Sequence, residues 1–152
     1  MCVIAHIALM ESTFGPDNCY CFASRRSARW LTRMYDAALS PCNLTISQFS
    51  LLTVLEHYGR LKVAELTEVM VMERTSLVRA LKPMLDSGLI QSSAQIGERA
   101  KVLSLTERGI AKLAEASPYW ESAQLTFESQ FGIEPAARSR RDNIEISHAR
   151  HS

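Results

Sequence analysis

The chain has 152 residues, of which 47% are hydrophobic and 22% charged, and these proportions are typical of one soluble globular domain with its own core. Sparse Gly and Pro and an aromatic content of 7% exclude a collagen-like or disordered chain. The formal net charge is +1, so the overall charge does not indicate nucleic-acid binding, and any basic surface must be local.

The start of the chain predicts neither export nor a membrane anchor. The apolar stretch MCVIAHIALM contains no basic residue, and Glu11 and Asp17 follow where a cleavage site would have small residues. No apolar run reaches the roughly 20 residues of a membrane span. We therefore expect a cytoplasmic protein without a membrane partner. The cysteines are too scattered for a disulfide framework: Cys2, Cys19, Cys21 and Cys42.

The first half of the chain predicts three helices. Apolar residues at helical spacing indicate a long helix over Cys19–Leu39. Thr45 and Gln48 form a capping box, in which the hydroxyl accepts from the third helical N–H and the amide reaches back. The helix that begins there ends at Gly59, and a short helix follows over Val63–Met70.

The next helix is predicted within ERTSLVRALKPMLDSGLI, residues 73–90. Gly88 suits the left-handed conformation that often follows a helix. Pro83 removes one backbone donor and clashes one turn back, so these residues alone predict a kink or a restart. A stripe of apolar side chains is expected to be buried: Leu77, Leu81, Met84, Leu85 and, at its edge, Val78.

A short β-hairpin is predicted next. Two strands, Leu89–Ser92 and Lys101–Leu105, flank a charged loop over Ala94–Ala100. Two short helices followed by such a hairpin predict a mainly α fold with a small β-hairpin wing, the winged helix-turn-helix. In that fold the second helix of the pair enters a DNA major groove.

A helix follows the hairpin. Thr106 is predicted to cap it, Pro118 to interrupt it after about Ser117, and Trp120–Phe131 to resume it. After Gly132 the sequence is polar and predicts at most a weak amphipathic helix. We therefore divide the chain into an N-terminal extension, a central domain and a polar C-terminal tail, at residues 1–18, 19–132 and 133–152.

The pattern resembles the MarR family of bacterial transcription regulators over about residues 19–131. In that family the sequence of the recognition helix is an acidic residue, Arg-Thr-Thr/Ser-Leu, a variable residue, Arg, a variable residue, Leu-Lys-Pro-Leu, then Asp-Gly-Leu-Ile. The helix continues through the proline of this pattern. The resemblance implies a homodimer built from N- and C-terminal helices. In this chain the C-terminal dimerisation helix would lie in the tail, where the sequence predicts at most a weak helix. It also implies binding of a pseudo-palindromic operator in double-stranded DNA, usually as a repressor released by a small molecule or an oxidant. Four segments carry the resemblance: Leu44–Leu52 (LTISQFSLL), Val63–Met70, Glu73–Ile90 and Val102–Gly109 (VLSLTERG).

Two features depart from the family pattern. The family's wing carries an aspartate two residues before its arginine, and here Gly97 stands in that place, followed by Glu98 and Arg99. The tail after Gly132 lacks the family's Leu-rich last helix. These departures put the bracing of the wing and the C-terminal half of the dimer contact in doubt.

The predicted DNA-binding face is the polar side of the helix after Glu73. Between Met72 and Lys101 five basic residues stand against three acidic ones, an excess of +2 in a chain whose total is +1. Backbone N–H groups in the first turn favour a phosphate, and an arginine one turn later can reach a guanine edge or a phosphate. Without the resemblance, a solvated face with incidental arginines explains the pattern equally well. The predicted contacts are Arg74, Thr75, Ser76, Arg79 and Lys82.

Two further contacts are predicted on the wing. Arg99 matches the family arginine that enters a narrow minor groove, where the negative potential attracts it. Lys101 follows on the same hairpin. An exposed hairpin with ordinary charges is the alternative.

The resemblance also implies an effector pocket between the dimer helices and the DNA-binding lobe. We predict that Arg29, Trp30, Met34 and Phe49 line it, with Arg29 meeting an anionic aromatic or phenolic ligand. Core packing explains the same residues equally well.

A redox trigger is the alternative. Cys21-Phe22 resembles the Cys-Phe of the organic-hydroperoxide-sensing branch, where a thiolate held by tyrosines is oxidised to sulfenic acid. Tyr35 stands where one such tyrosine would be, and Ile46 replaces another. Cys19 lies two residues away on roughly the opposite helix face, which disfavours a mutual disulfide. A buried, inert cysteine is the commoner fate.

The sequence contains no recognisable catalytic set, so we expect no enzyme and no cofactor. A Gly-rich phosphate loop, Gly-x-Ser-x-Gly and His-Glu-x-x-His are absent. Cys19-Tyr20-Cys21 and the pair His148 and His151 lack zinc spacing, so no metal site is predicted. A winged-helix protein-interaction module that binds no DNA is the alternative of another class.

Overall fold

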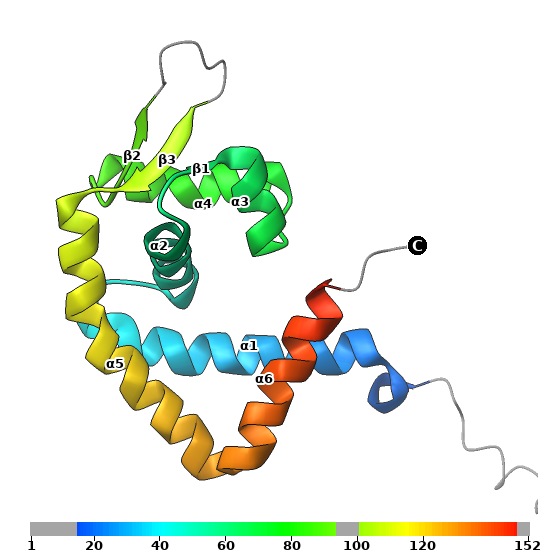
Figure 1. The fold of residues 1–152 in the computed structure, drawn as a ribbon. Coiled ribbons are helices and arrows are strands. Elements are labelled where there is room, and N and C mark those ends of the chain that lie inside the picture. The colour runs from blue at the N-terminus through cyan, green and yellow to red at the C-terminus, as the bar shows by residue number, and fades with distance from the viewer. Residues whose placement is uncertain (1–14, 94–100, 149–152) are drawn as a thin grey trace, which may run out of the picture. The chain divides into compact units, whose positions relative to one another are not determined.

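The computed structural model describes residues 15–93 and 101–148 (Figure 1). By their internal contacts the residues divide into two units, 1–34 and 35–152. The first unit contains the 3-10 helix η2 (Pro16–Asn18) and most of α1 (Tyr20–Leu39). Cys19 directly precedes α1: its carbonyl accepts from Ala23 N at 3.0 Å, and its Sγ accepts from Phe22 N at 3.4 Å. The predicted first helix is confirmed.

The second unit has the element order expected of a winged helix. The predicted helices and both predicted strands are present, whereas the two-residue strand β1 was not predicted. The expected charged loop lies outside the described residues. The elements are η3 (Ser40–Cys42), α2 (Ile46–Tyr58), β1 (Leu61–Lys62), α3 (Val63–Met70), α4 (Arg74–Asp86), β2 (Ile90–Ser93), β3 (Val102–Leu105), α5 (Glu107–Phe131) and α6 (Ile133–His148).

Helix α2 begins at the predicted capping box. Thr45 Oγ1 accepts from Gln48 N at 3.2 Å, and Gln48 Oε1 accepts from Thr45 N at 3.0 Å. Asp36 adds a third bond, because its Oδ1 accepts from Ile46 N at 2.7 Å. The start of α2 is therefore fixed both by its own residues and by the end of α1.

The three strands form one antiparallel sheet in the order β1-β3-β2. Val102 pairs with Lys62 on one side and with Ser93 on the other, so β3 is the central strand. Helix α2 contacts β3 and α5, while α4 contacts α3 and β2. Figure 1 shows α3 and α4 gathered beside this small sheet. The core between these elements is largely leucine, including Leu52, Leu66 and Leu77, each 0% exposed.

Pro83 and Pro118 each lie inside a continuous helix. Helix α4 runs through Pro83, as the family resemblance implied, so no restart occurs there. Helix α5 runs through Pro118, so the predicted interruption is wrong. A proline leaves the carbonyl four residues earlier without its helical donor. That residue is Ala114 for Pro118, and it is exposed, so water can solvate the carbonyl while buried Ala116 and Ala123 hold the helix on both sides.

Helix α5 begins in tight contact with the turn that ends α4. Thr106 Oγ1 accepts from Gly109 N at 3.0 Å and lies 2.6 Å from the Gly88 carbonyl oxygen, to which it donates. Thr106 N donates to Leu89 O at 3.2 Å. A Cβ built on Gly109 would lie 2.0 Å from Leu89 O, so only glycine permits this approach.

The tail contains a helix, α6, over Ile133–His148. It begins just after Gly132, whose φ of 95° ends α5, and Ala136 N donates to Gly132 O at 2.9 Å. Ala136 is buried, whereas every side chain described beyond Arg140 is exposed.

No single helix of the described residues is long and apolar enough to cross a membrane. The bent pair Tyr20–Cys42 and Ile46–Tyr58 reaches the required length and composition only when its two parts are taken together. Core helices pass such a test too, and much of α2 is buried.

Candidate nucleic-acid interface

Helix α4 separates a buried stripe from an exposed polar face. Leu77, Leu81 and Met84 are 0%, 3% and 0% exposed and hold the helix on the core. The prediction that Val78 and Leu85 are buried is wrong, because they are 50% and 37% exposed. Each follows a buried residue by one position, and a rotation of about 100° per residue carries it out of the buried stripe.

The predicted contacts on α4 share the exposed face. All five side chains there are exposed, so nothing in the described chain prevents their approach to a ligand. Lys101 is also exposed and directly precedes β3, whereas Arg99 lies outside the described residues. The five are Arg74, Thr75, Ser76, Arg79 and Lys82.

The start of α4 presents open backbone donors. Glu73 occupies the position before the helix, and its side chain makes no capping hydrogen bond. The first N–H groups of a helix have no partner within it, so those of Thr75 and Ser76 can donate to an anion. The hydroxyls of the same two residues are exposed beside them. This end of α4 is therefore suited to a phosphate oxygen.

Lys82 is partly neutralised by its neighbour. Its Nζ lies 2.8 Å from Asp86 Oδ2 one turn later, and both side chains are mostly exposed. The hydrogen bond and the negative charge of Asp86 raise the pKa of Lys82. The lysine therefore stays charged, but part of its field is already balanced.

Arg60 is a basic residue of this region that the sequence analysis did not select. It precedes β1, and its Nη2 donates to Ser93 Oγ at 3.1 Å at the end of β2. Because β1 and β2 flank β3, this bond places an exposed guanidinium at the base of the wing, where Lys101 also lies. The contact between Arg60 and Ser93 could not be predicted from the sequence, because 33 positions separate the two residues.

Among the four predicted effector-pocket residues, Phe49 is a core side chain. It is 4% exposed and stacks on Trp120 with ring centroids 5.9 Å apart. Arg29 and Trp30 are exposed and Met34 is half-buried, and all three belong to the first unit. Core packing therefore accounts for Phe49, and the pocket stays a prediction.

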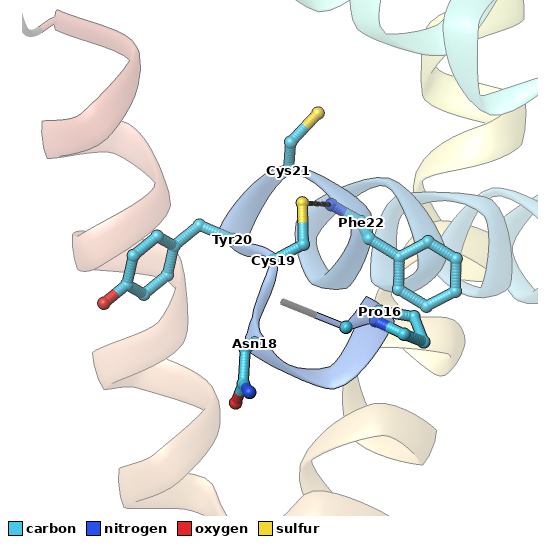
Figure 2. Close-up of a pocket in the computed structure, with 7 residues that line it drawn as sticks. Pro16, Asn18, Cys19, Tyr20, Cys21 and Phe22 are labelled. Atoms are coloured by element: carbon cyan, nitrogen blue, oxygen red, sulfur yellow. Dashed lines mark hydrogen bonds between the residues drawn. The ribbon is translucent and has the colours of Figure 1, made fainter. Parts of the chain in front are cut away.

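Two cysteines are exposed at the start of α1, where they help to line an open, mainly apolar hollow of about 810 Å³. Its other lining residues are Gly15, Pro16, Asn18, Tyr20 and Phe22. Figure 2 shows that the Cys19 sulfur accepts a hydrogen bond from Phe22 N and that the Cys21 thiol lies two residues further along the chain. Most free cysteines in proteins are buried and inert, whereas Cys21 is exposed. The redox role predicted for it stays a prediction.

Cys42 and Tyr35 lie in the second unit. Cys42 is 1% exposed, and burial, with the nearby Glu115 charge, raises the pKa of its thiol. The Tyr35 hydroxyl donates to Gln124 Oε1, and burial, followed by the charge of Glu128, raises its pKa. In the described part of the chain, no three His, Cys, Asp or Glu side chains gather as metal ligands would.

The model of the MarR family matches residues 44–97, which include α2, α3, α4 and β2. The M. tuberculosis transcriptional regulator MosR, solved in complex with DNA, is 36% identical, with 85% of this chain and 93% of that chain covered and a TM-score of 0.76. The chain belongs to the MarR family. A search of curated proteins found no match.

Two more distant structures share the MarR-family fold. B. bronchiseptica BpsR, studied for the regulation of its DNA binding by 6-hydroxynicotinic acid, has a TM-score of 0.77 at 15% identity, covering 90% of this chain and 98% of that one. A cysteine-to-serine mutant of E. coli MarR with operator DNA has a TM-score of 0.73 at 17% identity, covering 82% and 90%. At these identities the likeness concerns the winged-helix fold alone.

Proposed function

We propose that this chain, a DNA-binding transcription regulator by its family, acts in the cytoplasm as a homodimeric repressor on a pseudo-palindromic operator. Each α4 lies in a major groove, and the wing that bears Arg99 and Lys101 follows the adjacent minor groove. Two such helices require half-sites centred about one turn, roughly 34 Å, apart.

The observation that carries the proposal is the exposed face of α4. Apolar residues fix the helix from behind, while Arg74, Arg79 and Lys82 project from it and the first turn offers open N–H donors. Arginines and lysines neutralise phosphates, and an arginine can also pair with a guanine edge. MosR, the similar protein solved in complex with DNA, supports DNA as the ligand of this protein.

Release by a small aromatic ligand is the proposed regulation, with Arg29, Trp30 and Met34 as candidate contacts. A few kcal/mol of differential affinity between two conformations suffices to release DNA. BpsR, which shares the fold, has its DNA binding regulated by 6-hydroxynicotinic acid, an aromatic acid, so a protein of this fold can respond to such an effector. The exposed thiol of Cys21 favours one alternative, a repressor released by oxidation.

DNA binding is tested by fluorescence anisotropy of reduced protein on the duplex upstream of its own gene, at several salt concentrations. Binding through several phosphates must weaken steeply as salt rises. Arg79→Glu should abolish it, while Arg141→Glu, the same charge reversal on an exposed face of α6, should leave most of it, with the oligomeric state checked by light scattering. Absent or salt-independent binding by wild type would instead favour a protein-interaction module.

The trigger is tested on the same complex. Stoichiometric cumene hydroperoxide should leave the anisotropy unchanged if the effector is a ligand, and a panel of hydroxylated aromatic acids should then lower it. Loss of binding on oxidation, restored by dithiothreitol and absent in Cys21→Ser, would establish the redox alternative. The equally exposed Cys19, changed to Ser, is the matched control.

A further inference from the structure

Val78 is an apolar side chain at the edge of the polar face of α4, next to the buried stripe. It is 50% exposed, although the neighbouring Leu77 is fully buried. Thr75 lies three residues before it and Lys82 four residues after it, and residues at these spacings share one helix face. Arg79 is the next residue and is exposed on the same side. A ligand that covers this side of the polar face therefore contacts Val78 as well.

Exposure of valine at this position has no structural benefit. A β-branched residue has a lower helix propensity than alanine, and an exposed one leaves its methyl groups in water. In a helix, however, valine keeps nearly one χ1 rotamer, so its two methyl groups point in a fixed direction. A rigid apolar side chain among flexible polar ones can contribute shape and apolar contact, but no hydrogen bond.

We propose that Val78 is a specificity-determining residue that recognises thymine by its C5-methyl group. In the major groove thymine presents a methyl group that cytosine and the purines lack, and a side chain without donors or acceptors can read only that feature. Thr75 and Arg79, on either side along the helix, supply the hydrogen bonds that fix the register. This inference rests on the proposed function, because it requires α4 to lie in the groove.

The test removes the methyl group of thymine and the methyl groups of Val78 separately. Operator duplexes in which single thymines are replaced by uracil keep every hydrogen-bonding group of the base edge and lose only the methyl. Wild type should bind the substituted duplex about three- to fourfold more weakly at one position per half-site, the loss expected when one methyl group is no longer buried. Val78→Ala, which loses both γ-methyl groups, should bind the thymine duplex more weakly and should respond less to uracil at that position.

Two control variants complete the experiment. Val78→Ile keeps a β-branched apolar side chain and should respond to uracil as wild type does, while Ile110→Ala removes an exposed apolar side chain, 52% exposed, from α5 and should respond likewise. An equal response to uracil in wild type and Val78→Ala, or no response at any thymine, overturns the inference while DNA binding stands. Failure of wild type to bind any duplex overturns the proposed function and this inference together.

Discussion

Gly109 provides the sharpest test of the packing that positions α4. In an ordinary helix, Gly→Ala stabilises by about 1 kcal/mol, because alanine has the higher helix propensity. Here the new Cβ would lie 2.0 Å from Leu89 O and 3.1 Å from the carbonyl carbon, and both are backbone atoms that no rotamer change can move. We therefore predict that Gly109→Ala destabilises the protein, the opposite of the usual sign.

The magnitude follows from what must separate. Moving α5 away from Leu89 stretches two hydrogen bonds, Thr106 Oγ1 to Gly88 O at 2.6 Å and Thr106 N to Leu89 O at 3.2 Å. Each contributes about 1 kcal/mol, and overpacking adds about 1–3 kcal/mol. After the gain in propensity is subtracted, the free energy of unfolding should fall by about 2–4 kcal/mol.

Urea unfolding followed by circular dichroism measures this change at one fixed protein concentration, since assembly also affects apparent stability. With a slope of about 2 kcal/mol per molar urea, the midpoint should fall by about 1–2 M. Gly15→Ala, where no atom lies within 4 Å of the new Cβ, should leave the midpoint unchanged. A Gly109→Ala protein as stable as wild type would refute the reasoning.

Four further predictions concern charge, thiols and the core. Asp86→Asn should free Lys82 and tighten DNA binding severalfold at low salt, with a smaller gain in the Lys82→Met background; equal gains in both would contradict a role for the ion pair. In native protein at pH 7.5, iodoacetamide followed by peptide mass spectrometry should modify Cys19 and Cys21 but not Cys42. The pKa of Cys42 is raised in the folded protein, so the stability that its neutral thiol contributes is complete below the pKa of the unfolded thiol and is lost as pH rises towards the folded pKa. A Cys42→Ala protein should therefore lose less stability than wild type above about pH 9. Phe49→Ala should cost about 3–5 kcal/mol in urea unfolding, whereas Tyr20→Ala, at 92% exposure, should cost under about 0.5 kcal/mol.

Features that depend on local chemistry could be predicted from the sequence. The capping box at Thr45 and the bounds of the helix over Val63–Met70 agree with the structure, because both follow from hydrogen bonds and periodicity within a few residues. The exposed residues of α4 were predicted for the same reason. Their contacts with DNA stay predictions.

Features that depend on tertiary contact could not be predicted. Pro118 was expected to break a helix because its cost is local, whereas the packing of Ala116 and Ala123 that maintains α5 comes from other elements. The sequence left open whether Phe49 lines a pocket or the core, and it could not predict that Phe49 packs on Trp120, which is distant in the chain. Val78 was assigned to the wrong face by one position, an error that a periodic pattern cannot exclude at the edge of a stripe.

The junction between α4 and α5 connects the exposed polar face of α4 to the rest of the second unit. Thr106 holds the Gly88 carbonyl at the end of α4, and α5 continues from there for 25 residues, about 37 Å, without a break at Pro118. Because Gly109 leaves no space against Leu89, α5 cannot slide at this point without moving the backbone that follows α4. A displacement of α5 by a bound effector or a second subunit would therefore change the position of α4, and the face of Arg79 would move with it.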